Sequence, residues 1–254
     1  MPPRNDQTGP TDRMIVAGAL SIAAVGILFT VGVSRSQLLP GEAAATRWVD
    51  ETLSGVLGPA SNVLDVAFTD AMAPTIFLAL VPVVAMAWGR LAAVTYFVAG
   101  AATGLTKLAD LVDRPRPTED LEWGTARFGN GGYPSGHVVY VVLVFGIIAY
   151  LASVYESDHR VRRGVVAGSV AIIVITAPSR VVELDHWPAD VVGGYLIAVP
   201  ALLMVIVTHR RAPAWIVRHA PPLSWLLDGG SGAGKVAGEF ADDGLDRGRG
   251  VAAE

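Results

Sequence analysis

The chain has 254 residues, with no cysteine, 19 Lys plus Arg, 23 Asp plus Glu and a net charge of −4. The absence of cysteine excludes disulfides, zinc–thiolate sites and a cysteine nucleophile, and the small net charge argues against a nucleic-acid partner. Charged residues make up 17% of the chain, whereas soluble domains average about 25%.

Six segments contain no charged residue, and each is near the roughly 20 apolar residues that cross the hydrocarbon core of a bilayer. They are residues 14–33, 71–89, 91–106, 138–155, 164–178 and 191–208. A water-soluble helical bundle is the alternative, but it needs polar stripes at helical spacing, which these segments lack. The sequence therefore predicts an all-α fold, an integral membrane bundle of six transmembrane helices.

The flanking segments define the predicted domains. Residues 1–13 are polar, and the run 14–33 is longer than the about 7–15 apolar residues of a signal peptide, so we expect a retained helix and not a cleaved signal. Residues 14–208 then form the membrane domain. Residues 209–254 form a tail that begins with tryptophans and prolines suited to the membrane interface and ends too polar and glycine-rich to pack.

Basic residues predict the orientation. With the N-terminus in the cytoplasm, the inner ends of the helices carry a higher density of basic residues than the outer loops, as the positive-inside rule expects. These inner residues are Arg4, Arg13, Arg90, Arg160, Arg162, Arg163, Arg210, Arg211 and Arg218. Both termini are then cytoplasmic, and the location expected is a bacterial plasma membrane. The outer loop 34–70 has apolar residues at helical spacing, which predicts a short interfacial helix; a packed connecting helix explains the pattern equally well.

Polar residues of complementary chemistry gather at the predicted outer face. Lys107 follows the third apolar segment, and Arg114 and Arg180 lie in or beside the later outer loops. These side chains supply positive charge and forked donors suited to phosphate oxygens. Ser135 and Gly136 stand where the fourth helix begins, so backbone N–H groups there would face an anion.

Two histidines and an aspartate complete the set. His186 and Asp190 are four residues apart, so on a helical turn the carboxylate would hold one imidazole nitrogen and leave the other to attack a substrate. His137 is suited to deliver a proton to a leaving oxygen.

Each of these residues also has a purely structural interpretation. Lys107 and Arg180 could place their charges at helix ends for solvation, and Ser135 could be an N-cap. The histidines could be interfacial residues, and the pair of His186 with Asp190 a surface contact. The structural interpretation does not explain why all these groups fall on one face of the membrane.

The residues also form three ordered motifs. Residues 107–115 read KxxxxxxRP, residues 134–137 read PSGH, and residues 179–190 read SRxxxxxHxxxD. This pattern resembles the type 2 phosphatidic acid phosphatase family of membrane lipid phosphatases, relatives of vanadium haloperoxidases. The resemblance covers about residues 71–208, and the six-helix layout extends it to residue 14.

The resemblance implies a role for each motif residue. The phosphoryl group would be bound by Lys107, Arg114, Ser135, Gly136 and Arg180. His137 would be the general acid, His186 the nucleophile that forms a phosphohistidine, and Asp190 its partner. The resemblance implies no metal and no cofactor.

The expected function is hydrolysis of a lipid phosphomonoester or diphosphate at the outer face. A polyprenyl diphosphate such as undecaprenyl diphosphate is the first candidate substrate, and phosphatidic acid or phosphatidylglycerophosphate is the next. Trp123, Arg127 and Tyr133 are candidates for headgroup selection. A lipid phosphotransferase using the same histidine is the alternative enzyme, and a transporter or lipid-binding protein is the non-enzymatic one. The expected partners are the lipid substrate and the bilayer, and the sequence does not determine the oligomeric state.

Overall fold

A computed structural model describes residues 10–36, 38–68, 71–104, 112, 114–117 and 132–228. Every element in these ranges is helical. The α-helices are α1 (Pro10–Ser36), α2 (Glu42–Ala67), α3 (Met72–Trp88), α4 (Arg90–Ala101), α5 (Gly136–Tyr155), α6 (His159–Val182) and α7 (Pro188–His219), and the 3-10 helix η3 (Pro221–Leu227) follows. The prediction of an all-α fold is confirmed.

Each of the six uncharged segments coincides with one helix, and these are α1, α3, α4, α5, α6 and α7. Within the described residues, α1, α5, α6 and α7 are long and apolar enough to cross a membrane. A fifth span results if α2 and α3, which are bent by 75° relative to one another, count as one. Because α3 has 17 residues and α4 has 12, the count of six spans stays a prediction.

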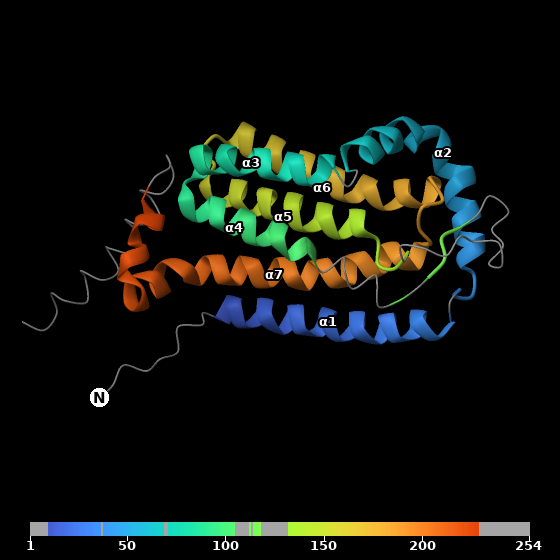
Figure 1. Ribbon diagram of the computed structural model, residues 1–254, viewed down its shortest axis with the longest axis horizontal. Helices are drawn as coiled ribbons and strands as arrows, with labels where there is room; N and C mark the ends of the chain where they lie inside the picture. Colours follow the sequence, from blue (N-terminus) through green and yellow to red (C-terminus); the bar gives the residue numbers. More distant parts are fainter. Residues whose placement is uncertain are drawn as a thin grey trace, which may run out of the picture.

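Helix α5 forms the centre of the bundle (Figure 1). Its side chains Val138, Leu143, Ile147 and Leu151 are fully buried, because α6, α7 and α4 all pack against it. A continuous apolar run with no polar face is what such a surrounded helix requires.

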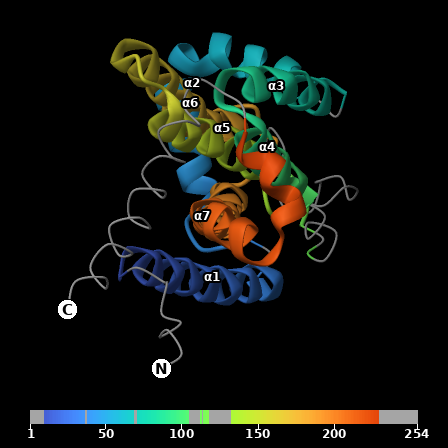
Figure 2. The same cartoon turned by 90° about the vertical axis from the view of Figure 1, so that its left-hand side faces the viewer.

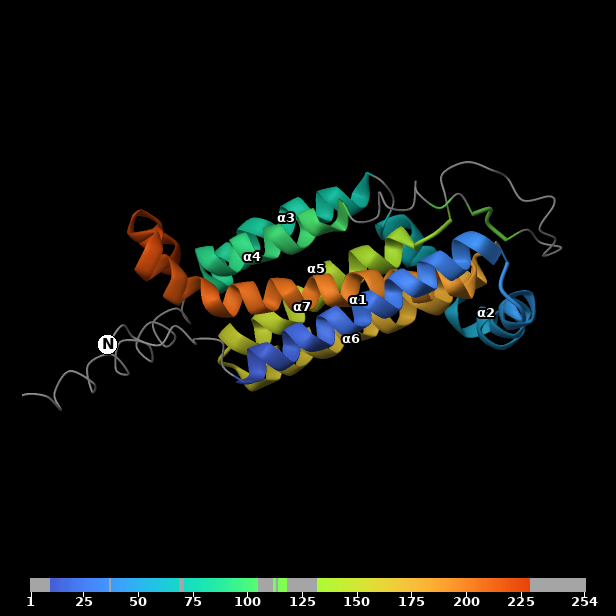
Figure 3. The same cartoon turned by 90° about the horizontal axis from the view of Figure 1, so that it is seen from below.

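Helix α1 lies at one edge of the bundle and packs against α7, as the end-on view shows (Figure 2). Helices α3 and α4 form an antiparallel pair at another edge (Figure 3). They are joined by Gly89, whose φ of 93° favours glycine because a Cβ would be strained there. Helix α2 curves around the end of the bundle at which α5 and α7 begin and α6 ends (Figure 1).

Two helices are longer than the segments that predicted them. In the loop 34–70, where we predicted a short interfacial helix or a packed connecting helix, the structure has the 26-residue α2, which packs on α6. Its place at the membrane interface stays a prediction. Helix α7 continues past residue 208, the predicted end of the membrane domain, to His219. Its polar last turns still pack, since Ile216 is buried.

Candidate active site

The three motif segments meet at one end of the bundle. Residues 114–117, the start of α5, and the turn between α6 and α7 all lie there, next to α2 (Figure 1). Backbone hydrogen bonds join them. The N–H of Gly132 donates to the carbonyl of Arg114 over 2.9 Å, and the N–H of Ser135 donates to the carbonyl of Asp190 over 2.9 Å. The backbone alone therefore links the three motif segments, in addition to the side-chain contacts described below.

His186 is buried directly ahead of α7, with 3% of its surface exposed. Its Nδ1 lies 2.7 Å from the carbonyl oxygen of Gly132. Because a carbonyl only accepts hydrogen bonds, Nδ1 carries the proton and Nε2 holds the lone pair of the neutral ring. The ring is therefore held in the tautomer that a nucleophile at Nε2 requires.

This contact corrects the expected partner of His186. We expected the Asp190 carboxylate to hold the ring on a helical turn, but α7 begins at Pro188, so His186 lies outside the helix. The Asp190 carboxylate is 3.7 Å from Nδ1, beyond hydrogen-bond length. The Gly132 carbonyl holds the ring, and Asp190 lies beside it as a negative charge.

Asp190 is itself held by several donors. One carboxylate oxygen accepts from the N–H of Trp187 over 2.8 Å, as in the first turn of a capped helix. The other accepts from Arg114. The second terminal nitrogen of Arg114 donates to Glu42 of α2. Arg114 is 2% exposed, so its guanidinium lies buried between two carboxylates.

Glu42 joins this network to the backbone. Its carboxylate accepts from the N–H of Leu39 and from the N–H of Ala189, both over 2.9 Å, in addition to Arg114. A buried carboxylate needs several donors to offset its desolvation, and Glu42 has three. It thereby connects the start of α2 to the first turn of α7.

Arg180, the last basic residue of α6, is fully buried. Its Nη1 donates to Asp65 of α2 over 2.9 Å and to Asp185 over 3.0 Å. Asp185 also pairs with Arg116 over 3.4 Å. The positive charge of Arg180 is therefore balanced from two directions, but its Nε has no hydrogen-bond partner among the described residues.

Ser135 and His137 carry two further buried polar atoms without such a partner, Ser135 Oγ and His137 Nε2. Ser135 occupies the N-cap position of α5, but its side chain makes no capping hydrogen bond. Backbone hydrogen bonds join the segments that carry these residues, since the N–H of Ser135 donates to the carbonyl of Asp190 and the N–H of His186 donates to the carbonyl of Arg180 over 3.2 Å. A buried polar atom left unpaired is costly, so three of them on segments that meet at this end of the bundle indicate a site for a polar ligand.

The structure describes two of the remaining predicted site residues, Gly136 and Tyr133. Gly136 is the first residue of α5, which agrees with the predicted helix start. Tyr133 is buried, and its hydroxyl lies 2.7 Å from that of Thr30 in α1. Burial raises the pKa of the Tyr133 phenol above its ordinary value, so the group remains a donor at neutral pH. Lys107, Trp123 and Arg127 lie outside the described residues.

Sequence reasoning missed Glu42, Asp65 and the carbonyl of Gly132. Glu42 and Asp65 belong to α2, far from the motifs in sequence, and both looked like ordinary polar residues of a loop. A charged residue at position 42 between a turn and an apolar helix was a weak signal. A backbone carbonyl leaves no signal in the side-chain pattern.

The comparison with protein families agrees with this geometry. The sequence model of the PAP2 superfamily matches residues 88–214, half of the chain and the whole of the three motifs. The chain belongs to the PAP2 superfamily. No curated protein and no solved structure matches it.

PAP2 superfamily membership implies phosphatase-type activity on phosphate esters. The matched region begins at Trp88 and so includes α5, α6 and most of α7 but not α1 or α2. Glu42 and Asp65 thus reach the PAP2 site from a part of the chain that the family match does not cover. Within the described residues, no group of three His, Asp or Glu side chains is arranged to hold a metal ion.

Proposed function

We propose that the chain is an integral membrane phosphatase that hydrolyses a lipid phosphomonoester or diphosphate through a phosphohistidine. The observation that carries the proposal is the group of buried, unpaired polar atoms, Ser135 Oγ, His137 Nε2 and Arg180 Nε. A phosphoryl group offers acceptors to all three. It also suits the first N–H groups of α5, which begin at Gly136.

The first step forms a bond between His186 Nε2 and phosphorus. The Gly132 carbonyl keeps the proton on Nδ1, so Nε2 can attack without losing a proton first. Arg180 and the start of α5 stabilise the negative charge that develops on the equatorial oxygens. The bond between phosphorus and the ester or anhydride oxygen breaks, and His137 protonates that oxygen as it leaves.

The second step releases phosphate. A water molecule gives a proton to His137 and attacks phosphorus, and the bond between phosphorus and Nε2 breaks. His137 regains the proton that it lost in the first step, and His186 returns to its neutral form. The imidazolium character of His186 in the phosphorylated state is stabilised by the nearby Asp190 carboxylate.

Arg114 has two roles in this proposal. The resemblance assigns it to the phosphoryl group together with Lys107. The contacts with Asp190 and Glu42 support a second role, in which Arg114 positions the Asp190 carboxylate against His186. The role of Lys107 at the phosphoryl group rests on the resemblance alone.

A polyprenyl diphosphate such as undecaprenyl diphosphate is the substrate we favour, because a site at the outer face suits recycling of a carrier lipid. Phosphatidic acid or phosphatidylglycerophosphate is the next candidate. The basic residues at the opposite helix ends support an outer-face site with both termini in the cytoplasm of a bacterial cell.

The test is phosphate release from a panel of purified lipid phosphates in detergent. We expect activity from the wild type and loss of at least about 1,000-fold in His186→Ala. His159→Ala is the matched control, because His159 is exposed at the far end of α6. Equal activity in His186→Ala and the wild type would contradict the mechanism. Labelling of a cysteine introduced at Arg116 from the cytoplasmic side would contradict the orientation.

A further inference from the structure

An apolar groove of about 320 Å³ lies between α1 and α7. Five residues of α1 form one wall at helical spacing, and they are Ala23, Gly26, Ile27, Thr30 and Val31. Leu196, Ile197 and Pro200 of α7 form the other. The two helices that line the groove lie side by side in Figure 3.

The two helices approach closely at Gly26, one of the residues that line the groove. A Cβ on Gly26 would lie 3.1 Å from the carbonyl oxygen of Leu196, so the backbones approach closely only because this residue is glycine. Ala23, one helical turn earlier, is small as well. Gly26 therefore lines the groove at the point where the helices approach closely, and the small side chain of Ala23 adds little bulk to the same wall.

The groove offers no hydrogen bond to a ligand from its two side-chain hydroxyls. Thr30 donates to the carbonyl of Gly26 over 2.8 Å. Its hydroxyl oxygen therefore accepts the hydrogen of the Tyr133 hydroxyl, 2.7 Å away. With both hydroxyl hydrogens used, the walls suit a hydrocarbon and not a polar or charged group.

One end of the groove reaches the candidate active site. Tyr133 and Pro134 line that end, and the next residue is Ser135. Val112, two positions before Arg114, lines it as well. A chain in the groove would therefore have its polar end beside the unpaired Ser135 Oγ.

The length of the groove agrees with a lipid chain. From Val31 to Ala23 the helix rises about 12 Å, which is most of the roughly 15 Å depth of one leaflet of a ~30 Å hydrocarbon core. Both residues lie within α1, one of the helices apolar enough to cross a membrane. The groove thus follows the direction that a substrate chain takes in the outer leaflet.

We propose that the groove between α1 and α7 binds one hydrocarbon chain of the lipid phosphate substrate and so makes the enzyme selective for chain length. This inference rests on the proposed function. Tyr133 closes the groove next to the phosphate site, and Ala23 and Pro200 lie at the end far from it.

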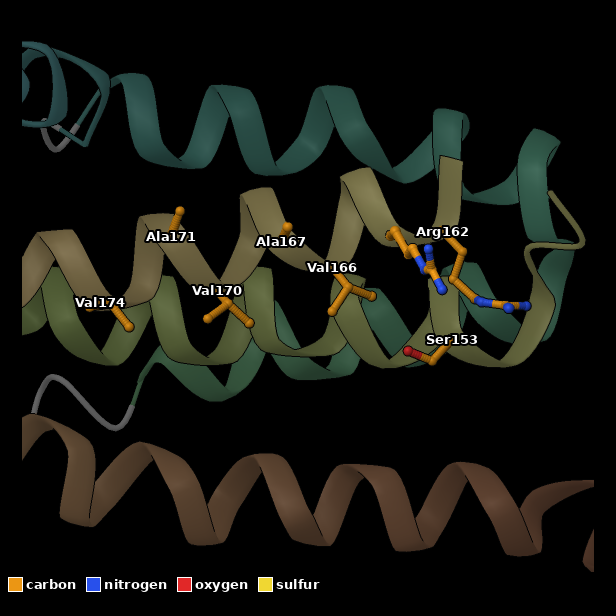
Figure 4. Close-up of a pocket in the computed structure, with 8 residues that line it drawn as sticks. Ser153, Arg162, Val166, Ala167, Val170, Ala171 and Val174 are labelled. Atoms are coloured by element: carbon orange, nitrogen blue, oxygen red, sulfur yellow. The ribbon is translucent and has the colours of Figure 1, made fainter. Parts of the chain in front are cut away.

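A second groove provides a contrast. It lies along α6 and is lined by Arg162, Val170 and Val174 among others, with Arg162 and Ser153 at one end and Val174 at the other (Figure 4). Arg162 is in the first turns of α6, at the end of the bundle opposite Arg180. None of its lining residues belongs to the three motifs, whereas the groove between α1 and α7 is lined by Pro134 of the PSGH motif, so we assign the substrate chain to the latter.

The test compares Ala23→Trp with Ala24→Trp. Ala23 lines the groove, whereas Ala24 is exposed on the same helix and does not line it. Phosphate release is measured from dioleoyl phosphatidic acid, dioctanoyl phosphatidic acid and p-nitrophenyl phosphate. Ala23→Leu is a milder variant in case the tryptophan disturbs folding.

We expect Ala23→Trp to lower kcat/KM for the dioleoyl lipid by about tenfold, to change the dioctanoyl value much less, and to leave p-nitrophenyl phosphate within about twofold. Ala23→Leu should show the same order with smaller changes, and Ala24→Trp should match the wild type. An equal loss on all three substrates, or no loss on the dioleoyl lipid, overturns the proposal.

Failure of the proposed phosphatase function can be distinguished from failure of the groove proposal. If the wild type releases no phosphate from any of the three substrates or from undecaprenyl diphosphate, the function is wrong, and the groove is then tested by binding alone. A phosphatidic acid with a diazirine in its chain should crosslink to α1 residues 23–31 and α7 residues 196–200, and this labelling should fall in Ala23→Trp. Labelling elsewhere, or labelling unchanged by the variant, overturns the groove.

Discussion

Glu42 is the buried carboxylate whose removal should most directly disturb the site. The side chain of Glu42 is 3% exposed, and it accepts hydrogen bonds from Arg114, the N–H of Leu39 and the N–H of Ala189. In Glu42→Gln one of the two oxygens becomes an NH₂ group. Whichever position the NH₂ group takes, it faces at least one N–H that needs an acceptor, so a buried donor is left unpaired.

The size of the effect follows from these contacts. An unpaired buried donor costs about 1–3 kcal/mol, and loss of one partner from a buried ion pair costs about 3–5 kcal/mol. Arg114 keeps Asp190 as a partner, so we expect the lower end, about 3 kcal/mol, and a fall in Tm of about 6–10 °C.

Activity should fall as well, because Arg114 would no longer be held between its two carboxylates. We expect kcat for p-nitrophenyl phosphate to fall by about 100-fold, as for a displaced catalytic group, with a much smaller change in KM. Glu42→Asp should have a higher kcat than Glu42→Gln but a lower one than the wild type, since aspartate keeps the negative charge on a side chain that is one methylene shorter.

The measurements are thermal unfolding in detergent and steady-state kinetics of the same preparations. Glu51→Gln is the matched control, because Glu51 is an exposed carboxylate on the same helix, and we expect a change within about 0.5 kcal/mol. A double-mutant cycle with Arg114→Gln should give a coupling of about 1 kcal/mol or more. If Glu42→Gln behaves like Glu51→Gln in both assays, the reasoning about this network is refuted.

Two further variants test other parts of the site. Arg180→Lys keeps the positive charge but loses the Nε–H and the forked geometry of the guanidinium, so kcat/KM should fall by about 100-fold while the protein still folds. Arg160→Lys is the control. Equal activity of the two variants would argue against a contact between Arg180 and the phosphate. In Gly193→Ala the new Cβ would lie 2.3 Å from the Tyr133 ring, so thermal unfolding should show a loss of about 1–3 kcal/mol. Gly164→Ala, where a Cβ meets nothing within 4 Å, should be neutral or stabilising, and a similar loss in both glycine variants would contradict the packing argument.

The helices were largely predictable from the sequence because their cause is local. A run of about 20 residues without charge forms a helix in lipid since every backbone group must find its hydrogen bond within the segment. The uncharged segments 138–155 and 191–208 accordingly fall inside α5 and α7. The ends of the helices were less predictable, and α7 continues to His219 because its last turns still pack.

The chemistry of the site was predictable in kind but not in its contacts. The order and spacing of the motifs pointed to a phosphatase of the family that the comparison then showed. The spacing of His186 and Asp190 suggested a hydrogen bond between them. It did not reveal that the helix begins at Pro188 or that the carbonyl of Gly132 takes the ring N–H.

The sequence by itself determined the helical fold class and the family. The helices follow from the low charge and the six apolar segments, and the PAP2 superfamily follows from the three motifs, because hydropathy and motif spacing are properties of neighbouring residues. Only the tertiary structure decided which residues complete the site. Glu42 reaches Ala189 across 147 positions of sequence, and Asp65 reaches Arg180 across 115. Such contacts depend on how α2 packs over the end of the bundle, and the local sequence does not predict where α2 lies.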